Sequence, residues 1–133
     1  MKKLFFSAVA LMLTTAVFAQ KPDEVAKFKT DVINMGNLEV GNPKTVTFEL
    51  TNISKQPIII EEAKPTCGCT IGDYTKEPIM PGKTGTITAT YNAAAVAPFT
   101  KHLNVKFAGI SEMKSITIKG TVLSKADFAK LKN

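Results

Sequence analysis

Four segments of the chain alternate apolar and polar residues with a period of two. In each segment, mostly β-branched and aromatic residues on one phase interleave with threonine, lysine and other polar residues on the other phase. This alternation is typical of a strand that packs one face on a core and turns the other to water. The sequence therefore predicts half-buried strands with these inward residues: Val46, Phe48, Leu50; Ile87, Ala89, Tyr91; Leu103, Val105, Phe107; and Ile116, Ile118, Val122.

Two weaker segments complete the strand pattern. One is the stretch KFKTDVINMG at 27–36, and the other is the continuous apolar run Pro57–Ile60. Turn signals with glycine or proline separate the segments at 41–43, 54–57 and 81–82. Six or seven strands in about a hundred residues, without a long helical period, predict an all-β fold. We expect an immunoglobulin-like antiparallel β-sandwich of about seven strands.

The beginning of the chain has the three parts of a secretory signal peptide. Lys2 and Lys3 precede an uncharged, mostly apolar run, Leu4–Phe18, and small residues follow at the positions that a signal peptidase reads. The run is shorter than the roughly 20 residues that cross a bilayer, so we expect no membrane-spanning anchor. No cysteine lies at the cleavage point after Ala19, so we also expect no lipid anchor.

The predicted cleavage point and the pattern near the end of the chain together divide the sequence into three parts. The protein is then exported, and its expected location is the periplasm or the extracellular space. Phe128 and Leu131 stand at helical spacing near the end, which indicates a short helix or a frayed end there. The predicted parts are a signal peptide at 1–19, the sandwich domain at 20–124 and a C-terminal tail at 125–133.

The charge of the chain argues against a nucleic-acid partner. All 17 basic residues are lysines, and two of them lie in the signal peptide, which leaves 15 against 11 acidic residues and a net charge of +4 after cleavage. Arginine, which makes bidentate contacts with phosphates and base edges, is absent, and the lysines are scattered singly. We expect the lysines to form a solvated surface.

Few residues could act as an acid, a base or a nucleophile. His102, the single histidine, falls on the polar phase of its strand, where a surface position is expected. Glu61 and Glu62 are adjacent, so on a strand they point to opposite faces and cannot act as paired carboxylates. The sequon Asn52-Ile53-Ser54 is a motif that occurs often by chance. The sequence predicts a protein that is not an enzyme and needs no cofactor.

The two cysteines, Cys67 and Cys69, flank Gly68 in the motif PTCGCT at 65–70. Export places them in an oxidising compartment, where a disulfide is favoured. Residues two apart on an extended strand have Cα atoms about 6.5–7 Å apart, near the upper limit for a disulfide. Glycine permits a closer approach, but a ring over one residue is strained, and strained disulfides are the more reducible ones.

Several interpretations of the motif therefore stay open. The alternatives are a structural disulfide within the chain, a pair of unreactive thiols, a thiol-exchange site, and a disulfide to another chain. Two thiolates could also hold Cu(I), whereas tetrahedral zinc needs two more ligands, which one histidine cannot supply. Apart from this Cu(I) alternative at Cys67 and Cys69, no metal site is predicted.

Five phrases of the sequence, in this order and spacing, are similar to a known family. They are FELTN at 48–52, TCGCT at 66–70, PIMPGKTGTITATYN at 78–92, FTKHLNVKF at 99–107 and ITIKGTV at 116–122. With them, the chain resembles the bacterial family catalogued as domain of unknown function 1573, from about Phe28 to Val122.

The resemblance implies a fold and a location. Members of the family resemble immunoglobulin-like sandwiches of the kind also found in the major sperm protein and pilus-chaperone groups, and most are exported or envelope proteins. No activity is implied. The motif transfers as the candidate site, on Cys67, Gly68, Cys69 and Thr70. Tyr74 stands near where many members have a tryptophan, which weakens the case for a shared ligand surface there.

Two functional hypotheses follow from these observations. The first is an exported, non-enzymatic β-sandwich that binds another envelope protein or a surface glycan through a sheet edge or a loop, because catalytic groups are scarce and the fold often serves recognition. The alternative is a thiol-disulfide or Cu(I)-handling protein that uses the Cys-Gly-Cys turn.

Overall fold

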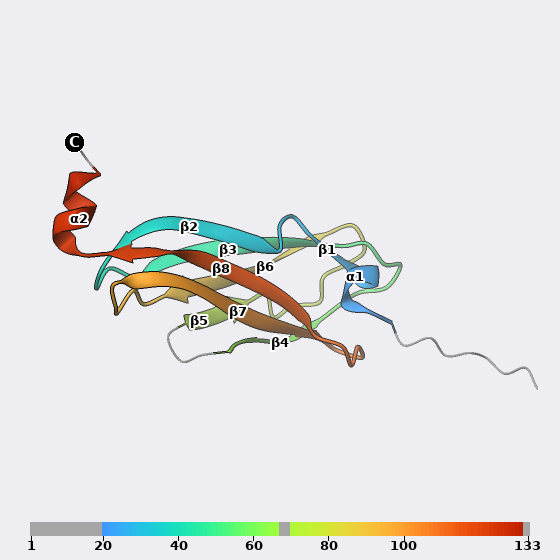
Figure 1. The fold of residues 1–133 in the computed structure, drawn as a ribbon. Coiled ribbons are helices and arrows are strands. Elements are labelled where there is room, and N and C mark those ends of the chain that lie inside the picture. The colour runs from blue at the N-terminus through green and yellow to red at the C-terminus, as the bar shows by residue number, and fades with distance from the viewer. Residues whose placement is uncertain (1–19, 67–69, 132–133) are drawn as a thin grey trace, which may run out of the picture.

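The computed structural model describes residues 20–66 and 70–131 (Figure 1). The predicted signal peptide at 1–19 lies outside the described residues, and so do Cys67, Gly68 and Cys69. The predictions about these two stretches therefore stay predictions. None of the helices in the described ranges is long and apolar enough to cross a membrane.

The described residues form eight strands and two short helices. In chain order these are α1 (Pro22–Val25), β1 (Ala26–Phe28), β2 (Val32–Glu39), β3 (Lys44–Asn52), β4 (Ile60–Pro65), β5 (Thr70–Tyr74), β6 (Thr84–Tyr91), β7 (Ala97–Phe107), β8 (Lys114–Leu123) and α2 (Lys125–Lys130). The four alternating segments lie in β3, β6, β7 and β8, which confirms them as strands.

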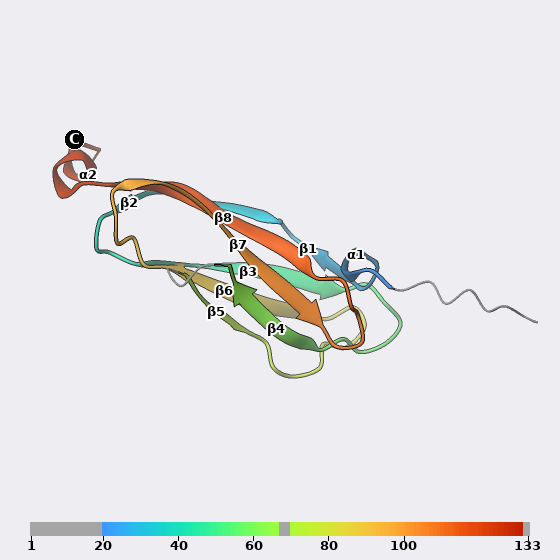
Figure 2. The ribbon, with the colours of Figure 1, turned by 60° about the horizontal axis from the view of Figure 1, so that its bottom comes forward.

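The strands form two four-stranded sheets that pack face to face (Figures 1 and 2). One sheet has the order β1-β3-β6-β5, and the other has the order β2-β8-β7-β4. This arrangement confirms the predicted immunoglobulin-like sandwich, with eight strands instead of about seven. One pairing departs from the expected antiparallel pattern, because β2 runs parallel to β8.

The core lies between the two sheets and contains the inward residues that the alternation predicts. Phe48, Ile87, Leu103 and Ile116 are fully buried, and they come from both sheets. Burial of apolar side chains on both inner faces is the main force that holds two sheets together. The periodicity of the sequence was therefore enough to find the centre of the molecule.

The stretch at 27–36, predicted as one strand, belongs to two strands in different sheets. β1 pairs with β3 through Phe28 and Leu50, whereas β2 pairs with β8. Each part buries its own apolar side chain, Phe28 in β1 and Met35 in β2, so the chain changes sheets between them. Gly36, with a φ of 74°, lies where the β2–β8 register shifts.

The apolar run Pro57–Ile60 is mostly a connection. Ile58 forms an isolated bridge with Ile79, and β4 begins only at Ile60. A register shift between Ile60 and Glu62 breaks the alternation of buried and exposed residues in β4, and this strand therefore had no period of two to detect.

Candidate functional site

The structure fixes both ends of the cysteine motif. Before it, the backbone N–H and the hydroxyl of Thr66 both donate to the carbonyl oxygen of His102, at 3.0 and 3.1 Å. After it, Thr70 is buried at the start of β5, opposite Tyr91 of β6. The stretch between these ends, Cys67–Cys69, lies outside the described residues. It connects the edge strand β4 of one sheet with the edge strand β5 of the other.

The other residues considered from the sequence as an acid or a base do not form a catalytic site. His102 is on the surface, where its Nδ1 lies 2.9 Å from the hydroxyl oxygen of Thr117. Glu61 is exposed and accepts a hydrogen bond from Lys106 at 2.9 Å, and Glu62 is also exposed. Across residues 20–66 and 70–131, no three acidic, histidine or cysteine side chains are grouped so that they could hold a metal ion.

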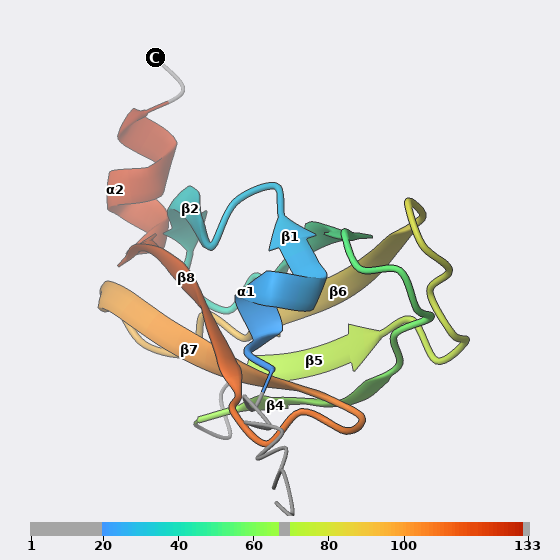
Figure 3. The same cartoon turned by 90° about the vertical axis from the view of Figure 1, so that its right-hand side faces the viewer.

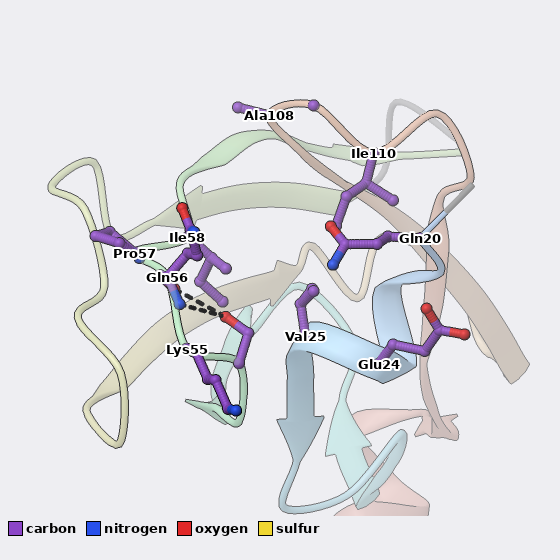
Figure 4. Close-up of a pocket in the computed structure, with 11 residues that line it drawn as sticks. Gln20, Glu24, Val25, Lys55, Gln56, Pro57, Ile58, Ala108 and Ile110 are labelled. Atoms are coloured by element: carbon purple, nitrogen blue, oxygen red, sulfur yellow. Dashed lines mark hydrogen bonds between the residues drawn. The ribbon is translucent and has the colours of Figure 1, made fainter. Parts of the chain in front are cut away.

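A concave site does exist, at the end of the sandwich where α1 lies. We call it the end pocket; it has a volume of about 580 Å³ (Figure 4). Three segments far apart in the sequence form it: the beginning of the described chain, the β3–β4 connection and the β7–β8 connection. Its lining residues are Gln20, Glu24, Val25, Ser54, Lys55, Gln56, Pro57, Ile58, Ala108, Gly109 and Ile110.

Asn52 holds the β3–β4 connection in place. Its side chain is buried, and its amide nitrogen donates to the carbonyl oxygens of Gln56 at 2.7 Å and Ile79 at 2.8 Å. Its amide oxygen accepts from the backbone N–H and the hydroxyl of Ser54 at 2.8 and 2.7 Å. All four hydrogen-bonding positions of the side chain are used. The Asn52 sequon is therefore not accessible in the folded protein.

A tight turn shapes the β7–β8 side of the pocket. The N–H of Ile110 donates to the carbonyl oxygen of Phe107 at 3.1 Å, and Gly109 between them has a φ of 79°. Glycine is the residue that adopts this backbone conformation without steric cost. The N–H of Ala108 donates to the carbonyl oxygen of Ile59 at 2.9 Å, which joins this turn to the β3–β4 connection.

The third side of the pocket is α1. Pro22 is its first residue, where a fixed φ favours a helix start and no N–H is needed. The carboxylate of Glu24 accepts a hydrogen bond from the N–H of Lys21 at 3.2 Å. Val25, the last residue of α1, is buried against the core. This short helix therefore presents one apolar and one acidic side chain to the pocket.

The end pocket has an aliphatic floor and a mixed polar rim. Val25, Ile58 and Ile110 are buried around its base, whereas Glu24 and Lys55 lie on opposite sides of its opening (Figure 4). The hydroxyl of Ser54 is hydrogen-bonded to the amide oxygen of Asn52 at 2.7 Å and to the carbonyl oxygen of Gln56 at 2.8 Å. The arrangement suits binding of an apolar group with polar surroundings. It offers no nucleophile with a base beside it among the described residues.

Sequence reasoning missed this pocket. Residues 54–57 were recognised as a turn, but neither this turn nor the segment around Gly109 carries a motif of its own. Only the folded chain brings 20–25, 54–58 and 108–110 together. No signal in a single sequence indicates such a convergence.

Comparison with protein families gives one match over most of the sandwich. The family model described as "Protein of unknown function (DUF1573)" matches residues 26–122. The chain belongs to this family. The match ends within β8, so it spans β1 to β8 of this DUF1573 protein and leaves α2 outside. Among curated proteins, no match was found.

Solved structures with the same fold come from unrelated sources. A protein of unknown function from Porphyromonas gingivalis W83 superposes with a TM-score of 0.64 at 13% identity, over 74% of this chain and 46% of that one. The PapD-like domain 7 of human CEP192 gives 0.62 at 11% identity, over 81% and 92%. The VesB protease of Vibrio cholerae gives 0.58 at 15% identity, over 75% and 32%.

These likenesses show the fold of the DUF1573 chain and nothing about its activity, because all three identities are far below 25%. The chain spans about half the length of the Porphyromonas protein and a third of the protease. The CEP192 domain is matched over 92% of its length, so the sandwich has the fold of that whole domain.

Proposed function

We propose that this DUF1573 protein is an exported, non-enzymatic binding module of the bacterial envelope, and that the end pocket binds a segment of another envelope protein. The observation that carries the proposal is the pocket itself. Its volume of about 580 Å³ lies within the range of roughly 300–1,000 Å³ that is common for ligand sites, and its floor is aliphatic with charged groups on the rim.

The lining favours a protein partner over a surface glycan. None of the eleven lining residues is aromatic, and the floor consists of Val25, Ile58 and Ile110. An aliphatic side chain of a partner would gain free energy by leaving water for this floor. The polar side chains of the rim can hydrogen-bond to a sugar, but sugar hydroxyl groups that reach the aliphatic floor would lose hydrogen bonds to water without replacing them. A peptide segment with one or two aliphatic side chains therefore fits best.

The chemistry of the rim supports binding without catalysis. Glu24 and Lys55 are the charged side chains in the pocket, and the hydroxyl of Ser54 already donates within the Asn52 loop. General acid–base or nucleophilic catalysis needs a base beside the reacting group. Export is part of the proposal through the sequence of residues 1–19, and an N-terminus at Gln20 in the mature protein would support it.

The test is capture of a partner by the purified protein from an envelope extract, compared with two variants. Ala108→Trp places a large side chain at the edge of the end pocket, at an exposed loop position. Ala94→Trp makes the same change at an exposed position in the β6–β7 connection, outside the pocket. We expect Ala108→Trp to abolish capture, whereas Ala94→Trp retains it.

Two results would contradict this proposal. If no protein is captured at low or high salt, the chain is not a protein-binding module of this kind. If Ala94→Trp abolishes capture and Ala108→Trp does not, the binding surface lies in the region of Tyr91 and Thr70, where β5 and β6 meet the cysteine motif. That second result would favour the thiol-site alternative, and a Cys67→Ser variant would then be the next to compare.

A further inference from the structure

Residues 20–31 form a segment that covers the end of the sandwich, and we call this segment the strap. It contains α1 and β1, which lie over the end of the two sheets (Figure 3). Its pairing with β3 is short, because β1 has three residues and sits at the edge of its sheet. Its apolar anchors are Val25, Ala26 and Phe28. Such a short edge strand needs further contacts to stay in place.

Lys114, the first residue of β8, supplies such contacts at three points of the strap. Its Nζ lies 2.8 Å from Oδ1 of Asp23 in α1 and 3.2 Å from Oδ2 of Asp31 at the end of the strap. The same Nζ lies 5.8 Å from the centre of the Phe28 ring, within the range of a cation–π contact. One ammonium group therefore contacts the beginning, the middle and the end of the strap.

This ion pair differs from the others in the described chain. The Lys114 side chain is 15% exposed, whereas the lysines of the other pairs are 28–79% exposed. Exposed pairs contribute little because water and salt screen them. The Lys114 ammonium is largely buried and is therefore screened less, whereas its partners Asp23 and Asp31 are 72% and 54% exposed. Removal of the cation takes this partner from both carboxylates at once.

We infer that Lys114 is a positioning residue of the end pocket: by holding the strap against the sandwich, it sets where Glu24 and Val25 stand in the pocket wall. Asp23 faces Lys114, and its neighbours Glu24 and Val25 line the pocket. Release of Asp23 would therefore move the pocket wall directly. The inference rests on the proposed role of the pocket as the binding site, but the effect of Lys114 on the strap can be measured without a partner.

The experiment is amide hydrogen exchange of the purified protein, read by mass spectrometry of peptides. Lys114→Met keeps the length of the side chain and removes its charge. We expect the rate of amide exchange in residues 21–31 to rise about tenfold or more, with little change in β6 and β7. Lys114→Arg keeps the charge and should retain most of the protection. Trypsin should cleave Lys114→Met faster at Lys27 and Lys29.

Lys106→Met is the matched control. It removes a lysine that makes a 2.9 Å ion pair with Glu61, on β7 and away from the strap. Its strap should exchange as in the unchanged protein. If Lys114→Met does not fold, Asp23→Asn and Asp31→Asn each remove one half of the contact, and each should raise exchange in its own part of the strap.

Two outcomes would overturn the inference. The first is exchange in the strap that stays the same in all Lys114 and aspartate variants. The second is a uniform rise over all strands, which would make Lys114 a general stabilising residue. The proposed function is tested separately. If strap exchange rises as expected but Ala108→Trp still captures its partner, Lys114 does hold the strap and the pocket is not the binding site. Weaker capture by Lys114→Met, with capture by Lys106→Met unchanged, would support both.

Discussion

At the scale of single residues, Asn52 is the polar side chain that does most to organise the molecule. It occupies an inward position of β3, in phase with Phe48 and Leu50, and its exposed fraction is 1%. A polar group buried in this way is tolerated because every donor and acceptor has a partner. From the sequence, Asn52 was considered only as part of a sequon, because its partners come from two loops that no local pattern connects.

Asn52→Ala should lower the free energy of unfolding by about 3 kcal/mol, since it removes all the hydrogen bonds of a buried side chain and leaves the N–H of Ser54 without its partner. The carbonyl oxygens of Gln56 and Ile79 keep one donor each, the hydroxyl of Ser54 and the N–H of Ile58. Urea denaturation followed by circular dichroism measures the change. Asn37→Ala, at an exposed position of β2, is the control and should change stability by less than about 0.5 kcal/mol. Equal effects of the two substitutions would contradict the prediction.

Gly120 is required for a different reason, which is space. A Cβ atom at this position would lie 2.7 Å from the carbonyl oxygen of Gly36 and 2.8 Å from the Phe99 ring. That ring stacks on Tyr91 at 3.9 Å between centroids, so it links the two sheets and has little room to move. Gly120→Ala should therefore cost about 2 kcal/mol of stability.

The comparison for Gly120 is Ser115→Ala, an exposed position on the same strand. It should leave the urea midpoint nearly unchanged. A Gly120→Ala variant as stable as Ser115→Ala would mean that Phe99 and β2 can both shift to admit the methyl group.

At the scale of secondary-structure elements, the sequence predicted central strands well and edge strands poorly. β3, β6, β7 and β8 lie inside their sheets and show a clear period of two. β1, β2, β4 and β5 lie at the edges. A change of sheet divides β1 from β2, and a register shift interrupts β4. These features depend on contacts between distant segments, which a local pattern does not contain.

The helix α2 is an element that the sandwich does not need. It begins at the cap Ser124, whose hydroxyl oxygen accepts from the N–H of Asp127 at 3.2 Å, and none of its residues is buried. A variant that ends at Ser124 should keep its free energy of unfolding within about 1 kcal/mol of the full chain, because little apolar area is lost. A much larger loss in urea denaturation would show that Phe128 packs on β2 more firmly than its partial exposure indicates.

At the scale of the whole molecule, the fold was predictable and the candidate site was not. The fold follows from alternating segments separated by turns, and this information is local. The end pocket requires that Val25, Ile58 and Ile110 meet, although more than thirty residues separate each from the next. The cysteine motif shows the reverse case, because Cys67 and Cys69 were visible in the sequence and lie outside the described residues.

The same ion pair that holds the strap should make the stability of the molecule depend on alkaline pH. Burial acts to lower the pKa of Lys114, but the hydrogen bonds and charges of Asp23 and Asp31 outweigh it, and the pKa is raised above its ordinary value of 10.5. A raised pKa in the folded state means that the charged form stabilises the fold. This contribution is complete below about pH 10 and is lost as the pH rises through the folded-state pKa.

The measurable quantity is the difference in unfolding free energy between the unchanged protein and Lys114→Met. The other lysines and both tyrosines are present in both proteins, so their titration largely cancels in the difference. We expect the difference to be constant between pH 7 and about pH 10 and to shrink above the ordinary lysine value of 10.5. A decline that begins between pH 7 and 9, or a difference that persists unchanged through the titration of lysine, would mean that the charge of Lys114 is not what holds the strap.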